Sequence, residues 1–575
     1  MFRLFLPYLR KFKKELSLAV VCLVLEDSVE LTIPLVLADI MDSGIVHGDI
    51  GIVIRGCGLM LLLALIALLF GRTYARQIAK GGQGFGAELR KAQFEKVQRF
   101  SFLNVDHFSS SGLLTRLTGD VQIIQNMITS GIRPAVRGVI TIFVAMIFSF
   151  SLDRRLAMIF MVMLPILGIG LLVIIRSVYP LFPKQQASVD RMNMIIQENL
   201  LGIQIVKAFC REDHEEAKFL AAAAEQRRVA EKSNRISSLS TPLMQFSVYA
   251  TICGMLLYGG HLYLQRLTTI GVLTGILTYL RQVLNSMMMV SNVFLLITRS
   301  AASTVRVAEV LNEKPDITDA DMEDIAVEQG DIRFEHVYFK YEQNAPEYVL
   351  SDITLHFSPG QTIGIIGGTG SAKSSLVQLI PRLYDVSKGT VLIDGRPVKK
   401  YPLHHLRDAV GVVLQKNTLF SGTIAENLRW GNADADDEEL RAACRDAGAD
   451  EFISGFTDGY QTRLGRHGAG FSGGQTQRIC IARALLKHPK ILILDDCTSA
   501  VDTATETRIW QNLRSHYPNM TKIIIAQRIS SVIDADQIVI LQDGKVEAFG
   551  THEELLAANE IYREIFHSQL EGALL

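Results

Sequence analysis

The sequence lacks the features of a disulfide-rich, polyanion-binding or secreted protein. Its seven cysteines are scattered, with no C-x-x-C pair, so neither a disulfide framework nor a zinc site is indicated. The formal net charge of −1 lacks the excess of Lys and Arg on which phosphate-backbone affinity depends, so we do not expect nucleic acid as a partner. The N-terminus also lacks a short apolar core followed by a small-residue cleavage site, so we expect no removable signal peptide.

Charge is nearly absent from long stretches of the first half. These stretches extend to about Ala302, whereas beyond Asn312 charged residues recur every few positions, as on a soluble surface. A chain of 575 residues is too long for one hydrophobic core. We therefore expect a membrane domain over residues 1–310, a linker over 311–330 and a soluble α/β domain over 331–575.

Six segments of the first half have the length and composition of transmembrane helices, which need about 20 mainly apolar residues. The predicted spans are residues 16–45, 52–75, 135–152, 156–175, 242–264 and 272–297. Five basic residues precede the first span, and the long connections at 72–137 and 176–241 each carry ten Lys or Arg. The positive-inside tendency places these parts, and the second half, in the cytosol. Because the connections are polar and helix-prone, we expect the helices to extend well beyond the bilayer.

Charged residues within the spans allow two interpretations, since an ionisable group at bilayer depth usually faces a cavity or a partner. Glu26 and Glu30 share one helix face, with Asp27 beside them and Arg281 in the last span as a candidate counter-ion. Either these groups line a translocation cavity for cationic or amphipathic substrates, or they form a structural ion pair, or the charged turn lies nearer the interface than the predicted span places it.

A glycine-rich segment follows a predicted strand at residues 362–366. It fits the pattern G-x-x-x-x-G-K-[ST] except at Ala372, which replaces the second required glycine and should crowd the loop. In this pattern backbone N–H groups surround phosphates, Lys373 reaches the outer phosphates and Ser374 can ligate magnesium. The residues predicted to hold the nucleotide here are Gly367, Gly368, Thr369, Gly370, Ser371, Ala372, Lys373, Ser374 and Ser375.

Further motifs follow in a fixed order. They are F-S-G-G-Q at 471–475, I-L-I-L-D-D at 491–496 on a second predicted strand, S-A-V-D at 499–502, Gln415 in V-V-L-Q-K-N and Tyr341 in F-K-Y. Together they resemble the signature, Walker B, D-loop, Q-loop and adenine-stacking motifs of ATP-binding-cassette (ABC) proteins. Residues 108–120 and 198–212 resemble the two coupling regions of the exporter branch, so the resemblance covers nearly the whole chain.

The resemblance implies a six-helix membrane domain followed by a P-loop nucleotide-binding domain, with ATP and Mg²⁺ as cofactors. Cassettes of this family meet head to tail, so each ATP lies between one chain's Walker residues and the other chain's signature loop. The metal ligands implied are Ser374, Gln415 and Asp495, and the signature residues offered to a partner are Ser472, Gly473, Gly474 and Gln475. A second half-transporter is therefore expected, in a plasma membrane.

Two departures from the family fall on hydrolysis. Asp496 stands where the family usually has the catalytic Glu, and its carboxylate lies about 1.5 Å further back, a displacement that can cost ~10²-fold in rate. Gln527 replaces the switch histidine and cannot carry a proton. The motif lent to a partner remains intact, although Arg466 replaces a frequent Glu before it. This pattern predicts a heterodimer with a partner that has Glu and His.

Two alternatives stay open at this stage. One is a homodimeric exporter with two slow sites, and the other is an ATP-gated regulator without transport. Amphipathic small molecules, lipids and peptides are all compatible transport substrates. The residues predicted to be nearest the ATP chemistry are Asp496, Gln527 and Gln415.

Overall fold

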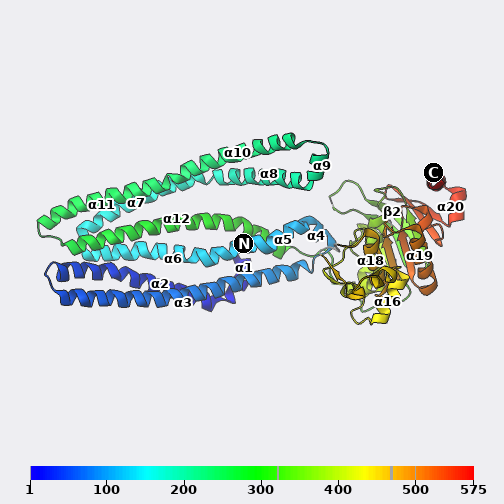
Figure 1. Ribbon diagram of the computed structural model, residues 1–575, viewed down its shortest axis with the longest axis horizontal. Helices are drawn as coiled ribbons and strands as arrows, with labels where there is room; N and C mark the ends of the chain where they lie inside the picture. Colours follow the sequence, from blue (N-terminus) through cyan, green and yellow to red (C-terminus); the bar gives the residue numbers. More distant parts are fainter. Residues whose placement is uncertain (1, 320–322, 343, 466–469, 499, 575) are drawn as a thin grey trace. The chain divides into compact units, whose positions relative to one another are not determined.

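The computed structural model describes residues 2–319, 323–342, 344–465, 470–498 and 500–574 (Figure 1). The chain divides into two compact units. The first is helical and holds the residues up to Gln98 and Ser110–Glu313, whereas the second holds Arg99–Ser109 and the residues from Lys314 onward. The division therefore falls at Glu313, and the residues that follow, where a linker is predicted, group with the second unit.

Long helices make up the first unit, and polar caps start two of them at the predicted outer turns. Asp49 accepts from the backbone N–H groups of Gly51 and Ile52, and Thr269 accepts from that of Val272. The helices are α1 (Phe2–Arg10), α2 (Lys13–Asp39), α3 (Ile50–Val97), α5 (Ser110–Thr115), α6 (Val121–Leu152), α7 (Arg154–Val178), α8 (Leu181–Leu201), α9 (Ile203–Ala208), α10 (Glu212–Ser238), α11 (Ser240–Leu264) and α12 (Ile270–Asn312), with π-helical turns at Ile40–Ile45 and Arg116–Asp120.

The helices of this unit pack in pairs. Helix α2 runs along α3, α6 along α12, α7 along α11 and α8 along α10, as Figure 1 shows. Small residues permit the closest approaches: a Cβ added at Gly86 of α3 would collide with the side chain of Gln125 on α6. Five of the six predicted spans lie within these helices, and the first, residues 16–45, runs through α2 and the π-helical turn that follows it.

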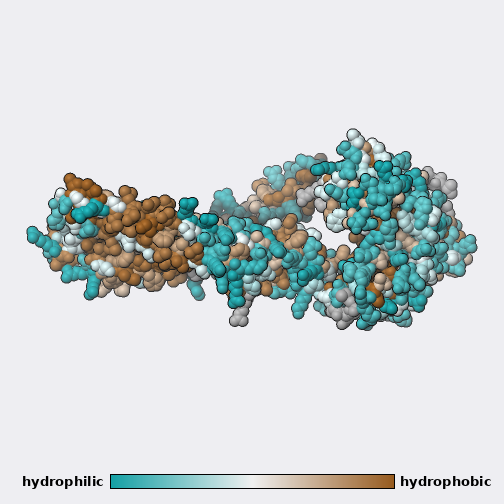
Figure 2. All heavy atoms as spheres, turned by 90° about the horizontal axis from the view of Figure 1, so that it is seen from below, coloured by the Kyte–Doolittle hydropathy of each residue, from teal (hydrophilic) through white to brown (hydrophobic). Residues whose placement is uncertain are grey.

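An apolar surface identifies the part of the first unit that suits a bilayer. Figure 2 shows a brown hydrophobic band over the helices, with teal hydrophilic surface where they continue. Within the described part of the chain, four helical stretches are long and apolar enough to cross a membrane: Ile50–Val97, Ser110–Leu152, Arg154–Leu201 and Glu212–Leu264. The other two predicted spans lie in α2, where Glu26, Asp27 and Glu30 interrupt the apolar run, and in α12.

The second unit is built on two main sheets. The larger has the strand order β12-β11-β3-β10-β9-β6, parallel except for β12, and the smaller antiparallel sheet has the order β2-β1-β4-β5. The predicted strands at 362–366 and 491–494 are confirmed as β3 and β9. The strands are β1 (Ile332–Phe339), β2 (Leu350–Phe357), β3 (Thr362–Ile366), β4 (Lys388–Ile393), β5 (Arg396–Pro397), β6 (Val410–Val413), β7 (Gly422–Thr423), β8 (Arg463–Leu464), β9 (Ile491–Asp495), β10 (Thr521–Ile525), β11 (Gln537–Gln542) and β12 (Lys545–Gly550).

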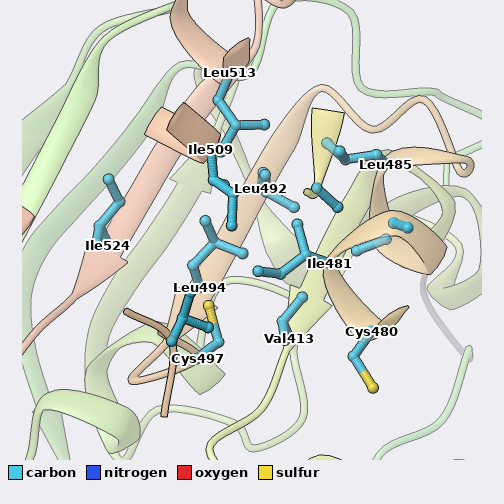
Figure 3. Close-up of a cluster of buried hydrophobic side chains, with 14 of the residues drawn as sticks. Val413, Cys480, Ile481, Leu485, Leu492, Leu494, Cys497, Ile509, Leu513 and Ile524 are labelled. Carbon is cyan, nitrogen blue, oxygen red and sulfur yellow. The ribbon is translucent and has the colours of Figure 1, made fainter. Parts of the chain in front are cut away.

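Apolar runs explain why the parallel strands are central. Strand β9 is buried along its whole length. Its residues Leu492 and Leu494 pack with Ile481 of α18 (Gly473–Leu485) and Ile509 of α19 (Thr503–His516), as Figure 3 shows. The helices of this unit are α4 (Phe102–Phe108), α13 (Lys373–Gln378), α14 (Leu403–Ala409), α15 (Ile424–Leu428), α16 (Asp437–Asp446), α17 (Asp450–Ser454), α18 (Gly473–Leu485), α19 (Thr503–His516), α20 (His552–Ala558) and α21 (Glu560–Leu574).

Candidate nucleotide-binding site

The glycine-rich loop joins β3 to α13 and brings its backbone close to its neighbours. A side chain at Gly367 would collide with the carbonyl oxygen of Leu541 and would lie 2.7 Å from Ser371 Oγ. Ala372, which caps α13, has a φ of 70°, in the left-handed region that costs an L-residue about 1–2 kcal/mol. The predicted crowding at Ala372 is therefore a strain of the backbone.

Lys373 lies across the mouth of this loop. Its ammonium donates to the carbonyl oxygens of Gly367 at 2.9 Å and Gly368 at 2.8 Å, and to Ser371 Oγ at 3.3 Å. Burial lowers the pKa of Lys373, while the charges of Asp495 and Asp496 act in the opposite direction. Among the described residues, the ammonium of Lys373 bonds only to neutral oxygens, and a polyphosphate would give it negatively charged acceptors instead.

Oxygen donors suited to Mg²⁺ meet at the carboxyl end of β9. Ser374 Oγ donates to Asp495 Oδ1 at 3.0 Å, and burial raises the pKa of Asp495. Mg²⁺ prefers oxygen ligands and is usually held by one or two carboxylates together with substrate phosphates. The predicted ligands Ser374 and Asp495 thus fit the ion, whereas Gln415 turns its amide nitrogen toward Asp496.

Two glutamines converge on the carboxylate that follows Asp495. Gln527 Nε2 donates to Asp496 Oδ2 at 2.6 Å, and Gln415 Nε2 lies 3.4 Å from the same oxygen. The three residues come from the ends of β9, β10 and β6, which are parallel neighbours, so their side chains gather at one sheet edge. The sequence-predicted catalytic residues are therefore brought together.

Tyr341 packs beside the same loop. Its ring contacts Phe339 and Tyr384 edge-on, with centroids 4.8 Å and 5.1 Å away, and its hydroxyl lies 2.8 Å from Ser375 Oγ. The ring is thus held by neighbouring aromatics, and its stacking on adenine stays a prediction.

The signature residues form a second group at the N-terminus of α18. Ser472 and Gln475 cap the helix reciprocally: Ser472 N donates to Gln475 Oε1 at 2.9 Å, and Gln475 N donates to Ser472 Oγ at 3.2 Å. Gly474 lies against Ala500, whose carbonyl oxygen would be 2.5 Å from an added Cβ. Gly473 and Ser472 are exposed. Arg466 and Ser499 lie outside the described residues.

A segment from the first half of the sequence packs into the second unit, ahead of the predicted coupling region. Tyr384 Oη donates to Asp106 Oδ2 at 2.8 Å, and the rings of Tyr384 and Phe102 are 6.0 Å apart. The residues of this segment are Arg99–Ser109, and the coupling region predicted at 108–120 begins at its end and stays a prediction. No local pattern marks Tyr384, since its partner lies 278 residues away in the sequence. The predicted second region, 198–212, contains α9.

The acidic residues of α2 pair with α6 rather than with the predicted Arg281. Arg133 Nη2 lies 2.5 Å from Glu26 Oε1, and Arg137 contacts both Asp27 and Glu30. Arg281 is exposed on α12. Glu26 and Glu30 are four residues apart, as are Arg133 and Arg137. The parallel helices α2 and α6 therefore bring Glu26 to Arg133 and Glu30 to Arg137. This i,i+4 spacing on both helices was the signal available in the sequence.

The second unit holds a P-loop with its lysine, a serine hydrogen-bonded to an aspartate, and a helix capped by a Ser-Gly-Gly-Gln motif. The first unit is helical and has an apolar band. These features define an ATP-binding cassette joined to a membrane domain. Residues 16–287 match the family described as ABC transporter transmembrane region, and residues 350–499 match the family described as ABC transporter. The chain belongs to the ABC transporters. It is an exporter half in which a multi-pass membrane domain precedes an ATP-binding domain, which confirms the predicted fold class.

Similar proteins cover nearly the same length. The chain is 35% identical to the uncharacterized ABC transporter ATP-binding protein YfiB of Bacillus subtilis, over 98% of each chain. It is 30% identical to the putative multidrug export ATP-binding/permease protein YgaD of the same species, again over 98% of each. A solved structure of a bacterial Atm1-family ABC exporter with ATP bound is similar with a TM-score of 0.83 and 25% identity, covering 97% of this chain and 99% of that one.

Proposed function

We propose that this chain is the weakly hydrolysing half of a heterodimeric exporter. ABC exporters work as dimers, and the partner proposed here is a different half-transporter with Glu and His at the positions of Asp496 and Gln527. The observation that carries the proposal is the pair of amide donors on Asp496 Oδ2. An oxygen that already accepts from Gln527, and lies close to Gln415, is poorly placed to take a proton from an attacking water.

The residues around this carboxylate suit binding better than turnover. Lys373 and the loop from Gly367 to Ser375 would hold the phosphates, and Mg²⁺ between Ser374 and Asp495 would neutralise part of their charge. Gln527 can donate a hydrogen bond to a γ-phosphate but cannot store a proton. Bound ATP would therefore persist and keep the two cassettes associated between cycles.

The signature group would serve the partner's ATP. Ser472 and the first glycine after it are exposed, and the capping box fixes the start of α18, so the backbone N–H groups there are presented to an anion. The proposed activity is ATP-driven export of hydrophobic or amphipathic substrates across the plasma membrane, with most hydrolysis at the partner's site. The relative YgaD, named for multidrug export, and a 32% identical ATP-dependent lipid A-core flippase of Syntrophus aciditrophicus support this substrate class.

The test uses the transporter purified through a tag on this chain from its native membrane, so that any partner is recovered with it. Mass spectrometry of the complex distinguishes a homodimer from a heterodimer. In the heterodimer we expect Ser472→Ala to lower ATPase turnover more than Asp496→Asn, because preorganised donors on the γ-phosphate act mainly in the transition state.

The matched control is Thr551→Ala, which removes the same kind of capping box from α20 without touching nucleotide. It accounts for the loss of about 1 kcal/mol expected from any lost cap. If Asp496→Asn stops turnover while Ser472→Ala leaves it intact, the assignment of the hydrolysing site is reversed. ATP-dependent substrate uptake by inverted vesicles separates an exporter from a regulator.

A further inference from the structure

The loop that carries Gln527 leaves the sheet and loses the partners that a strand provides. Strand β10 ends at Ile525, and Ala526 N still donates to the Ile365 carbonyl oxygen at 3.2 Å. The paired registers of β10 with β3 and β9 end at Ile525. Backbone N–H and C=O groups in such a loop need other partners if the loop is to hold one conformation.

One side chain from the C-terminal helix supplies two of these partners. Gln569 Nε2 donates to the carbonyl oxygen of Gln527 at 2.9 Å, and Gln569 Oε1 accepts from Ile529 N at 2.8 Å. The amide thus pairs with residues i and i+2 of the loop on either side of Arg528, as a neighbouring strand would. Gln527 is in this way bonded to Gln569 through its backbone and to Asp496 through its side chain.

Helix α21 offers a rigid base for this contact. Tyr562, one of the largest fully buried side chains, packs into the core of the second unit, and its hydroxyl lies 2.6 Å from His552 Nδ1 of α20. Ile565 and Phe566 pack against the same core. Beyond the loop, Ser531 Oγ donates to the buried Glu506 at 2.7 Å, so both sides of the loop are tied to the domain.

We infer that Gln569 is a positioning residue of the ATP site, which holds the Gln527 loop at the distance from which its side chain reaches a terminal phosphate. The inference rests on the proposed role of Gln527 as a γ-phosphate donor. Because ADP lacks that phosphate, loss of the Gln569 contact should weaken ATP binding much more than ADP binding. A purely structural role for α21 would affect both nucleotides alike.

The experiment measures photolabelling of this chain by 8-azido-ATP in the purified full-length transporter, with competition by ATP or ADP at low temperature. Gln569→Met keeps the length of the side chain and removes both hydrogen bonds, while Gln569→Glu keeps only the acceptor for Ile529 N. We expect Gln569→Met to raise the ATP concentration that halves the photolabelling about threefold to tenfold. The ADP concentration that halves it should rise by less than about twofold. The effect on ATP corresponds to the loss of one to two net hydrogen bonds. Because a carboxylate oxygen would then face the Gln527 carbonyl oxygen, Gln569→Glu should weaken ATP binding at least as much as Gln569→Met.

Ser568→Ala is the matched control, because Ser568 is exposed on the same helix. Gln527→Ala separates the two ideas. If Gln527→Ala weakens ATP selectively and Gln569→Met does not, the positioning role of Gln569 is wrong while the role of Gln527 stands. If Gln527→Ala weakens ATP and ADP binding equally, both the role of Gln527 as a γ-phosphate donor and the positioning role of Gln569 are wrong. Equal weakening of ATP and ADP by Gln569→Met also overturns the inference.

Discussion

At the scale of single residues, the two departures from the family's usual catalytic residues, Asp496 and Gln527, touch one another. Asp496 is half-buried at a φ of 47° and receives Gln527 on one oxygen. A shorter carboxylate needs a donor near it to be held, and the amide of Gln527 provides one. The two substitutions therefore form one local unit, and correcting one alone leaves the other in place.

The first prediction concerns this unit. Asp496→Glu or Gln527→His alone should raise ATP turnover at this site only slightly, whereas the double variant should raise it up to about 10²-fold, the usual size of a restored general base. The ATPase rate is measured in the purified transporter whose other site has been disabled. Equal rates for Asp496→Glu and the double variant would show that Gln527 does not limit hydrolysis.

How far the sequence predicts the site depends on how local each signal is. The positions of Lys373, Ser374 and Asp495 follow from short motifs, and the structure brings them together as expected. Neither Gln569 nor Tyr384 could be found in this way, because each acts on residues far away in the sequence and lies in no motif. The error over Arg281 has another origin, because the matching i,i+4 spacing of the acids on α2 and of Arg133 and Arg137 on α6 was visible in the sequence.

At the scale of elements, charge pairing fixes the register of two membrane helices. Arg133 and Arg137 on α6 meet Glu26, Asp27 and Glu30 on α2, and Thr141 Oγ1 donates to Asp27 Oδ2 at 2.9 Å. Removing one member of such a set would leave a costly unpaired charge. A slip of α2 along α6 by one turn would break these pairs.

A pair of substitutions tests this register. Glu30→Arg alone should lower the amount of folded transporter, because it places two arginines together, while Glu30→Arg with Arg137→Gln should recover part of the loss, because the amide removes the repulsion and can still donate to Asp27. Fluorescence-detected size-exclusion chromatography in detergent gives the folded fraction. If the double variant is no better than the single one, Glu30 faces the substrate pathway, and transport of cationic and neutral dyes by Glu30→Gln should then differ.

A buried lysine at the start of β10 gives an element-scale prediction about pH. Lys522 is 2% exposed and donates to the carbonyl oxygens of Tyr517 and Met520. Burial lowers the pKa of Lys522 to about 8. Between that value and the ordinary lysine pKa of about 10.4, the unfolded chain binds more protons than the folded one, so stability from this group rises with pH.

We therefore expect the wild type to gain about 2 kcal/mol in unfolding free energy between pH 8 and pH 10 relative to Lys522→Met. Urea unfolding followed by tryptophan fluorescence suits the measurement, because both tryptophans, Trp430 and Trp510, belong to the second unit. Parallel pH curves for the two proteins would contradict the assignment.

At the scale of the whole molecule, one helix of the nucleotide-binding unit lies in the sequence between two helices of the membrane unit. Helix α4 packs into the nucleotide-binding unit, and its neighbours in the sequence, α3 and α5, belong to the helical unit. Tyr384 contacts Asp106 and Phe102, and both of these residues lie on α4, between α3 and α5 in the sequence.

Tyr384→Phe should consequently lower substrate transport about threefold or more while changing ATP binding little, since one hydrogen bond of about 1 kcal/mol is lost at the coupling segment alone. Vesicle transport and ATPase rates are compared for the same preparation. Tyr401→Phe, which removes a buried hydroxyl bonded to the Ile393 carbonyl oxygen elsewhere in the domain, is the control. A proportional loss of transport and ATPase in Tyr384→Phe would mean that the contact serves stability rather than coupling.

The length of α3 has a mechanical consequence. Its 48 residues run without interruption from the outer turn to the segment before α4. At a rise of about 1.5 Å per residue such a rod is about 70 Å long, more than twice the thickness of a bilayer core. A tilt of only about 5° at one end would carry the other end by about 6 Å. A small change in the tilt of α3 at one end therefore shifts its other end by about the length of a side chain, through leverage alone.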